Sequence, residues 1–420
     1  MSRPLASGSW QAGLGVTIVA GLILWADLGA QQWTGWRGPN RDGVVQVAGP
    51  GVWPEMLNRK WQVEVGEGYA NPLFADGRIF QFAKQNGNEV ALAIDPASGT
   101  ILWRQSYPAS TFEPVSAAAR HGTGPFSTPV YDAGMLYTFG STGVLSAFDA
   151  TTGELAWRHD HATDFKSTWV MFGNAMSPIV SDGLVVALIG TNEDGAIVAH
   201  DARSGAERWM WRGDGPAYAS PVVVELDGVK QVVSFTERYL VGLALESGEL
   251  LWQRDFPARS GMNIPTPVLL GQAQTILAGT AEGTYALRVT RSGGRWSIEE
   301  VWQNADIGLR FSTPVRKDDL LFGFTSMNRG AFFALDVRTG RTLWMSEPRQ
   351  GDNAAPLLLG DHVLLLRDTG ELIVAEASST DFRPVRRYQV SDSATYTHPL
   401  VLADGIVVKD ATTLSLLGWD

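Results

Sequence analysis

The chain has 420 residues, of which 45% are hydrophobic and 18% are charged. This composition supplies enough apolar side chains for a large core and differs from that of a disordered chain. The net charge of −11 argues against nucleic acid or an anionic membrane as the main partner. Cysteine is absent, which excludes disulfides, Cys-ligated metal centres, a cysteine nucleophile and lipidation through an N-terminal cysteine.

The first 30 residues have the pattern of a secretory signal peptide. Arg3 precedes an apolar run from Ala12 to Ala26, and Leu28-Gly29-Ala30 follows as a cleavage site. The run is short for a membrane span, which favours a cleaved signal over an uncleaved anchor. We therefore expect an exported protein, periplasmic or extracellular, that begins at Gln31. Residues 31–59 are expected to pack on the next domain as an extended strap, rather than to form a recognition tail.

From residue 60 onward the chain is repetitive. The five residues FSTPV occur at Phe126–Val130 and again at Phe311–Val315. They belong to a longer series in which a small or polar residue precedes a proline, at intervals of 42 to 57 residues. An apolar run, a tight turn and a second apolar run follow most of these prolines, which indicates antiparallel strand pairs. The prolines are Pro72, Pro129, Pro178, Pro221, Pro267, Pro314, Pro356 and Pro399.

A second phrase follows each hairpin, with the pattern small-x-x-x-x-[ST]-G-x-x-x-Trp. Its good copies are Ala93–Trp103, Ala147–Trp157, Ala199–Trp209, Gly242–Trp252 and Ala334–Trp344. The pattern predicts strand, turn, strand, with glycine at a positive φ and a tryptophan that buries a large apolar area. We interpret the tryptophans at this position as structural docking residues between neighbouring units. They are Trp61, Trp103, Trp157, Trp209, Trp252, Trp302 and Trp344.

Eight four-stranded units of this length predict an all-β, eight-bladed β-propeller over residues 60–420. The last unit supplies only three strands before the chain ends at Asp420. Residues 60–65 contain Trp61 but have no hairpin before them, so we expect this N-terminal strand to complete the last blade. FSTPV would then open the innermost strand of blades two and six.

The tryptophan phrase resembles the docking motif of the quinoprotein, or PQQ-like, β-propeller superfamily, and residues 33–44 resemble the start of exported bacterial PQQ-like repeat proteins. Two groups of that superfamily have known activities: dehydrogenases that use pyrroloquinoline quinone with calcium, and the propeller lipoprotein of outer-membrane β-barrel assembly. The adjacent-cysteine disulfide of the former and the lipidated cysteine of the latter are both impossible here. No calcium ligand set matches, so no catalytic residue is carried over.

The loops where the innermost strands begin are the expected site, because a propeller presents its function on one face. Long links at 105–125 and 159–176 add aromatic residues and histidines to one sector of that face. The candidate residues for binding a ligand or partner are His121, Trp169, Asn174, Tyr218, Asn263, Arg310, Asn353, Tyr396 and His398.

Other chemistry finds little support in the sequence. His159 and His161 place two imidazoles on one strand face, but no third ligand accompanies them, so no metal site is predicted. His200 and His362 are expected in turns of the opposite face, with structural roles. Hydrolase and phosphate-binding motifs are absent from the sequence.

The sequence therefore favours an exported, non-catalytic propeller without a cofactor, which binds an envelope protein or a small extracytoplasmic ligand. A quinone-dependent alcohol or sugar oxidoreductase remains the first alternative, with Asp306 among its scattered acids. A polysaccharide-binding module that uses Trp169, Tyr218 and Tyr396 is the second alternative.

Overall fold

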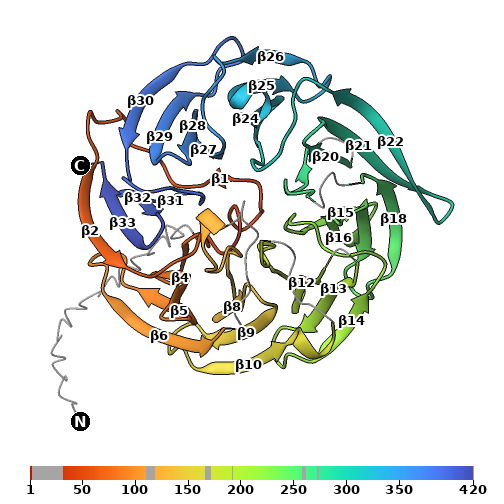
Figure 1. The fold of residues 1–420 in the computed structure, drawn as a ribbon, viewed down its shortest axis with the longest axis horizontal. Coiled ribbons are helices and arrows are strands. Elements are labelled where there is room, and N and C mark those ends of the chain that lie inside the picture. Colours follow the sequence, from red (N-terminus) through yellow and green to blue (C-terminus); the bar gives the residue numbers. More distant parts are fainter. Residues whose placement is uncertain are drawn as a thin grey trace. The chain divides into compact units, whose positions relative to one another are not determined.

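The computed structural model describes residue 1 and residues 32–109, 119–165, 172–191, 193–257, 262–271 and 274–419. By contacts the chain divides into two units, Met1–Ala30 and Gln31–Asp420, and the second unit contains the propeller. Within it, eight four-stranded blades follow one another around a ring (Figure 1), and the short strand β1 (Val44–Val45) adds a fifth strand to one of the sheets. The predicted all-β, eight-bladed propeller is therefore confirmed.

The first four blades are built from consecutive antiparallel strands. Blade 1 contains β3 (Leu73–Ala75), β4 (Arg78–Gln85), β5 (Asn88–Ile94) and β6 (Ile101–Pro108). Blade 2 contains β7 (Val130–Asp132), β8 (Met135–Phe139), β9 (Val144–Asp149) and β10 (Leu155–Asp160). Blade 3 contains β11 (Ile179–Ser181), β12 (Leu184–Gly190), β13 (Gly195–Asp201) and β14 (Glu207–Trp211). Blade 4 contains β15 (Val222–Leu226), β16 (Val229–Phe235), β17 (Tyr239–Ala244) and β18 (Leu250–Asp255).

The remaining blades follow the same order, except that the last takes a strand from the N-terminal side. Blade 5 contains β19 (Val268–Leu269), β20 (Thr275–Thr280), β21 (Gly283–Ser292) and β22 (Arg295–Asn304). Blade 6 contains β23 (Val315–Lys317), β24 (Leu320–Thr325), β25 (Ala331–Asp336) and β26 (Thr342–Met345). Blade 7 contains β27 (Ala354–Leu359), β28 (His362–Arg367), β29 (Glu371–Glu376) and β30 (Pro384–Gln389). Blade 8 contains β31 (Leu400–Leu402), β32 (Gly405–Lys409), β33 (Thr413–Gly418) and β2 (Asn58–Glu64).

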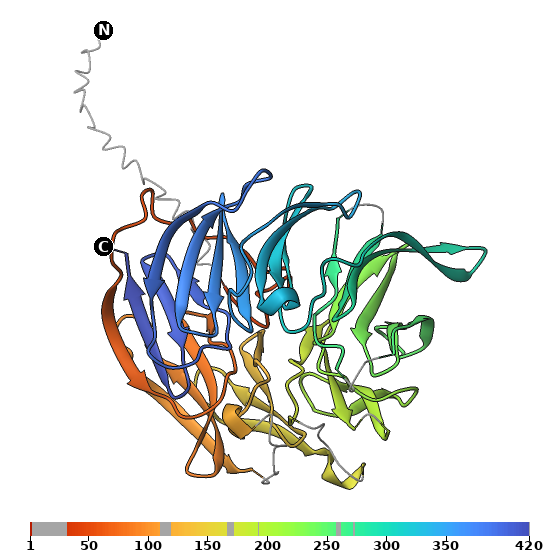
Figure 2. The ribbon, with the colours of Figure 1, turned by 45° about the horizontal axis from the view of Figure 1, so that its top comes forward.

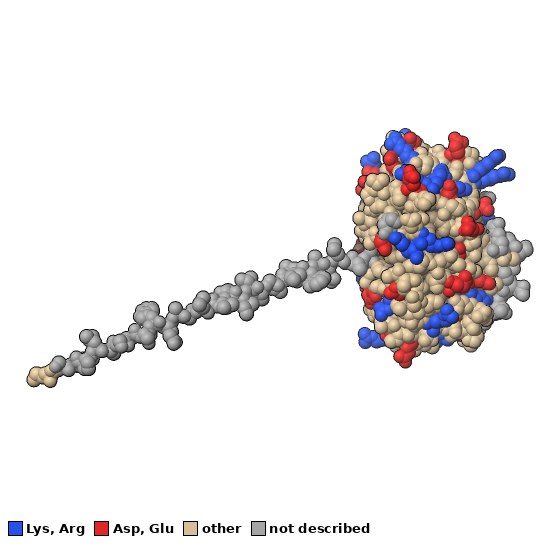
Figure 3. All heavy atoms as spheres, turned by 90° about the vertical axis from the view of Figure 1, so that its left-hand side faces the viewer, with Lys and Arg blue, Asp and Glu red and all other residues tan. Residues whose placement is uncertain are grey.

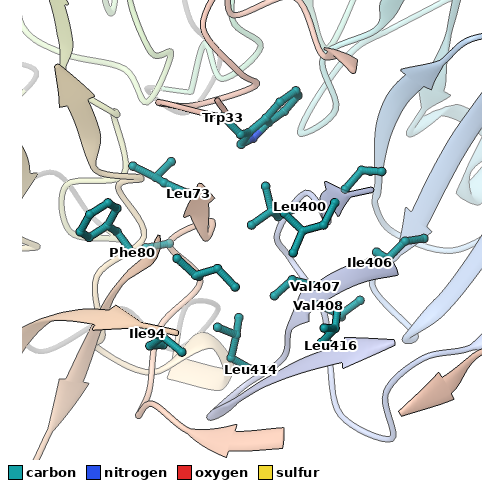
Figure 4. Close-up of a cluster of buried hydrophobic side chains, with 14 of the residues drawn as sticks. Trp33, Leu73, Phe80, Ile94, Leu400, Ile406, Val407, Val408, Leu414 and Leu416 are labelled. Carbon is teal, nitrogen blue, oxygen red and sulfur yellow. The ribbon is translucent and has the colours of Figure 1, made fainter. Parts of the chain in front are cut away.

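Ring closure occurs where the sequence predicts it. Strand β2 pairs antiparallel with β33, and Trp61 lies opposite Leu416. Figure 2 shows the N-terminal strand β2 running beside the C-terminal strands of blade 8. Apolar side chains of blades 1 and 8 then meet across the seam, and Trp33 is buried in the same cluster (Figure 4). Strand β2 thus completes blade 8 and closes the ring at the seam.

The tryptophans of the repeat join each blade to the next. In six of them the indole Nε1 donates a hydrogen bond to a backbone carbonyl in the following blade, at 2.8 to 3.0 Å. The glycine of the next phrase packs on the indole, so a Cβ at Gly99 would lie 2.8 Å from Trp61. Trp252 differs because blade 5 lacks a good copy of the phrase, and its Nε1 donates instead to Gln231 of its own blade at 2.6 Å.

The residue before most of the repeat prolines is polar because its side chain accepts a hydrogen bond from the neighbouring blade. Its backbone N–H donates to the side chain at the same position in the following blade, which links neighbouring blades at the start of their inner strands. These bonds run from His398 to Asn71, Asn71 to Thr128, Thr128 to Ser177, Ser177 to Ser220, and Thr266 to Thr313, at 2.9 to 3.1 Å. Ala355 holds this position in blade 7 and has no side-chain acceptor. FSTPV thus contributes one hydroxyl to this girdle in blade 2 and another in blade 6.

Residues 32–57, which we call the N-terminal strap, lie inside the ring for part of their course. Gln32 contacts Asp76 in the turn between β3 and β4, and Trp36 lines the opposite, channel-entry face. The strap then turns back through β1 (Val44–Val45), which pairs parallel with the inner strand β27 and lies inside the ring in Figure 1. Because β1 bonds blade 7 from the channel side, it joins the strap to the blade where Ala355 interrupts the girdle.

Two arginines of the strap are buried and bind backbone carbonyls of the inner strands. Arg37 donates to the carbonyls of Thr313 and Pro314 at 2.9 and 2.7 Å. Arg41 donates to the carbonyls of Ser177 and Pro221 at 3.2 and 2.6 Å, and also to that of Pro178. Burial lowers the pKa of Arg37 to about 10 and that of Arg41 to about 9, so both guanidinium groups are charged at neutral pH. The strap is therefore tied to blades 3, 4 and 6 at once.

The outer surface carries charges of both signs. Figure 3 shows Lys and Arg interspersed with Asp and Glu on one side of the propeller. Among the described residues, no helix has the length and apolar character needed to cross a membrane.

Candidate functional site

A cavity of about 450 Å³ opens on the channel-entry face, and the link before each of the eight blades contributes to its lining. Its walls are mostly aromatic or aliphatic. The lining residues are Trp36, Tyr69, His121, Phe126, Phe172, Ala175, Tyr218, Ser220, Met262, Ile264, Thr266, Arg310, Phe311, Thr313, Ser326, Arg329, Gly351, Asp352, Asn353 and Tyr396. We call this cavity the entry-face pocket, and its volume lies in the usual range of ligand sites.

One wall is a cluster of rings from blades 8, 1 and 2. Tyr396 meets Tyr69 edge to face with ring centroids 5.0 Å apart, and His121 meets Tyr396 at 4.6 Å. Phe126 stacks near Tyr69 at 6.3 Å. Edge-to-face and stacked ring contacts therefore hold this wall together.

The facing wall comes from blades 3, 4 and 5. The Tyr218 hydroxyl accepts a hydrogen bond from the Phe172 backbone N–H at 2.9 Å, and the two rings lie edge to face at 5.7 Å. Burial raises the pKa of Tyr218, so the phenol is neutral. Met262 and Ile264 complete this wall, which is therefore apolar with its main polar group already bonded.

Charged groups are confined to the sector of blades 6 and 7. Arg310 and Arg329 line the pocket there, together with Asp352 and Asn353. The Arg310 guanidinium lies 5.0 Å from the centroid of the Phe311 ring. Asp352 is the single carboxylate among the described lining residues, so the lining carries one more positive than negative charge.

The floor of the pocket is the strap. Trp36 donates from its indole Nε1 to the Thr266 hydroxyl at 2.9 Å and packs edge to face on His398 at 4.8 Å. The buried Arg37 follows directly and lies 3.4 Å from His398 Nε2. A ligand that enters from this face therefore meets Trp36 rather than an open channel.

Five of the predicted candidate residues come together in this pocket: His121, Tyr218, Arg310, Asn353 and Tyr396. Asn174, Asn263 and His398 are buried, with exposed fractions of 0%, 3% and 5%. Asn263 donates to the Phe256 and Thr236 carbonyls, which fixes its own loop, and His398 packs against the strap. Trp169 lies outside the described residues.

Several lining residues were not among the predicted candidates. Trp36 comes from the strap, and Arg329 comes from the short 3₁₀ segment η4 (Met327–Arg329) in the middle hairpin of blade 6. Phe126 and Phe311 are the first residues of the two FSTPV phrases, so the phenylalanine that both phrases share was the signal available in the sequence.

The histidines form a separate cluster at the junction of blades 2 and 3. His200 lies in β13, and its ring stacks on His159 at 4.6 Å and lies 5.3 Å from His161 in η2 (His161–Thr163). His200 thus lies beside His159 and His161, because β13 of blade 3 packs against the outer strand β10 of blade 2. Within the described ranges, no group of three His, Cys, Asp or Glu residues could hold a metal ion.

A quinone centre with calcium needs several oxygen ligands for the metal and a flat slot for the ring. The described pocket lining offers one carboxylate, Asp352, while Asp306 is exposed and does not line the pocket. Trp36 and its strap fill the floor. The residues present therefore do not fit that centre, and no catalytic step is derived through it.

Comparisons with known proteins agree with this architecture. A family model described as outer membrane protein assembly factor BamB matches residues 86–346 and 295–420. The chain is 27% identical over 248 residues to the outer membrane protein assembly factor BamB of Shewanella oneidensis, a match that covers 54% of this chain and 59% of that relative. It is 31% identical over 175 residues to the quinohemoprotein alcohol dehydrogenase ADH-IIG of Pseudomonas putida, covering 40% of this chain and 23% of the enzyme.

Among solved structures, BamB from Moraxella catarrhalis superposes with a TM-score of 0.61 and 14% identity, covering 86% of this chain and all of that one. This likeness concerns the fold, whereas the family model covers most of the sequence. The chain therefore belongs to the BamB family of propellers built from PQQ-like repeats.

Proposed function

We propose that this chain is an exported, non-catalytic propeller that binds a protein partner in the cell envelope through the entry-face pocket. The observation that carries the proposal is the pocket itself, to which every blade link contributes and whose floor the strap closes. Aromatic and arginine side chains gathered in one concave site are the residue types that dominate protein–protein binding energy.

The family adds support. Relatives named outer membrane protein assembly factors belong to it, and a signal peptide on this chain would deliver it to the envelope. The absence of cysteine removes lipidation through an N-terminal cysteine.

The experiment places a photo-crosslinking amino acid, p-benzoylphenylalanine, at Phe311 on the pocket rim and, as a matched control, at Leu155 on an outer strand. Both side chains are 44% exposed. In the producing cell we expect a discrete adduct from position 311 that mass spectrometry identifies as one envelope protein, and only background from position 155. Equal adducts at the two positions, or adducts from position 155 alone, would move the binding surface away from the pocket.

A further inference from the structure

The entry-face pocket has two unlike halves, and the boundary between them suggests what it binds. Rings and aliphatic side chains from blades 8 and 1 to 5 form the apolar half, whereas Arg310 and Arg329 stand in the sector of blades 6 and 7. The pocket lining carries more positive than negative charge, whereas the whole chain has a net charge of −11.

The two arginines are exposed, and neither forms an ion pair with another residue in the described part of the chain. Some exposed arginines of the propeller have such partners, for example Arg338 with Asp319 and Arg383 with Asp381, whereas others, such as Arg203 and Arg341, form no ion pair within the described ranges. The pocket therefore keeps two guanidinium forks available, and such forks match the geometry of carboxylates.

The backbone at Arg329 is held in an unfavourable conformation. Asn328 and Arg329 have φ values of 55° and 64°, so two consecutive residues other than glycine occupy the left-handed region. Asparagine adopts this region readily, but for an arginine the conformation costs on the order of 1 kcal/mol. Backbone bonds from Arg349 to Asn328 and from Gly351 to Arg329, both at 3.4 Å, tie this turn to the neighbouring link.

Beside the arginines lies an apolar contact surface. Phe311 is 44% exposed at the rim, with Arg310 over its ring, and Met262 and Ile264 continue the surface inward. An exposed phenylalanine next to an unpaired arginine suits a bulky apolar group that enters the pocket while an adjoining acid remains at the rim.

Resting on the proposed function, we propose that the pocket recognises a segment of the partner protein in which an aromatic or branched apolar side chain adjoins an acidic residue. The apolar side chain fills the ring-lined half above Trp36, and the carboxylate binds Arg310 and Arg329. Attraction to the exposed arginines is screened by salt, so affinity falls as ionic strength rises.

The first test uses two dyes with similar aromatic bodies. 8-Anilinonaphthalene-1-sulfonate carries an anion, and N-phenyl-1-naphthylamine is its uncharged counterpart. We expect Arg310→Gln/Arg329→Gln to weaken binding of the anionic dye by about fivefold to tenfold, because each exposed charge pair is worth roughly 0.2–1 kcal/mol. Binding of the neutral dye should not change.

The control variant is Arg203→Gln/Arg341→Gln, which removes the same charge from exposed turns at the opposite end of blades 3 and 6. It should leave the affinity for both dyes unchanged. If it weakens the anionic dye equally, or if both dyes are insensitive to the rim variant, charge selectivity in the pocket is refuted. Either result would leave the crosslinking test of the proposed function intact.

The second test separates a protein segment from a free acid. The acetylated, amidated peptides Leu-Phe-Asp-Leu and Leu-Phe-Asn-Leu and the single amino acid N-acetylphenylalanine compete with the anionic dye. We expect the Asp peptide to displace the dye at a concentration several-fold lower than the Asn peptide or the free acid. Equal displacement by the two peptides, or displacement by the free acid alone, would overturn the proposal.

Discussion

Two pairs of arginines near the channel of this propeller have opposite surroundings. Arg37 and Arg41 of the strap are buried and donate to backbone carbonyls of three blades. Arg310 and Arg329 of the pocket are exposed and have no ion-pair partner in the described part of the chain. The same side chain thus closes the channel in one place and remains available for a ligand in the other.

The difference shows how a propeller of this kind separates stability from binding. The inner strands begin at prolines, whose carbonyls the strap arginines bind in blades 3, 4 and 6. Buried carbonyls need donors, and these guanidinium groups supply several at once. The rim, by contrast, contributes few bonds to the fold and can be shaped for recognition.

The largest effect should come from removing the strap together with β2. Deletion of residues 31–66 takes away the strand that pairs with β33, so the edges of blade 8 become exposed and we expect aggregation. Size-exclusion chromatography checks this outcome. A deletion of residues 31–57 is the control, because it retains β2 and should stay monomeric with a lower melting temperature. A monomeric 31–66 deletion with unchanged melting temperature would contradict the role of β2.

The next effect compares the two pairs directly. Arg37→Gln/Arg41→Gln leaves inner-strand carbonyls without donors, and each unsatisfied buried group costs about 1–3 kcal/mol. We expect a loss of about 3 kcal/mol in the free energy of unfolding, since release of two buried charges offsets part of the cost. Arg310→Gln/Arg329→Gln should change stability by less than about 0.5 kcal/mol. Denaturant unfolding measures both, and equal losses would remove the distinction between the pairs.

The fold was predictable because every blade must bury apolar side chains against the blades on both sides of it. The proline and tryptophan phrases recur for that reason, and Trp61 without a hairpin indicated the closing strand. The insertion of the strap was not predictable in the same way. Arg37 and Arg41 read as ordinary charges in a loop, and the carbonyls that they bind come from blades far along the chain, brought together only when the ring closes.

The residues of the candidate site were predictable only to the level of one face of the propeller. Alternation of strands places the links at one end, and five predicted residues do line the pocket. The sequence does not show how deeply each link residue is buried. Asn263 and His398 lie in the same links as the pocket residues, but their side chains are buried. His200 approaches His159 only through the packing of blade 3 on blade 2, which the sequence of either blade does not reveal.

A pH effect should distinguish the interior from the rim. Arg37 has only donors to offer, so it requires an unprotonated Nε2 on His398, and burial together with the Arg37 charge holds the pKa of His398 well below its usual range. Burial lowers the pKa of His200 to about 4. The unfolded chain therefore binds more protons than the folded chain as pH falls from about 6.5, the ordinary histidine pKa. The contribution of these two histidines to stability is complete above that pH and declines towards pH 4.

The free energy of unfolding, measured by denaturant titration at pH 7.5, 6, 5 and 4.5, should fall with a slope of about 1.4 kcal/mol per pH unit for each proton taken up. His398→Asn and His200→Asn should each reduce the slope. A slope that neither variant alters would show that other groups control the acid sensitivity.

The smallest expected effect is the response to pyrroloquinoline quinone and calcium. The quinone is an aromatic polyanion, so the rim arginines can attract it weakly, but the described pocket lining offers a metal one carboxylate and Trp36 occupies the floor. We expect no calcium-dependent tight uptake and no dye-linked oxidation of alcohols or aldose sugars. Any weak uptake should disappear in high salt and in Arg310→Gln/Arg329→Gln, while Arg203→Gln/Arg341→Gln should retain it. Turnover above a blank, or calcium-dependent binding that survives the loss of both rim arginines, would instead place a cofactor in this pocket and make Asp352 the first carboxylate to replace.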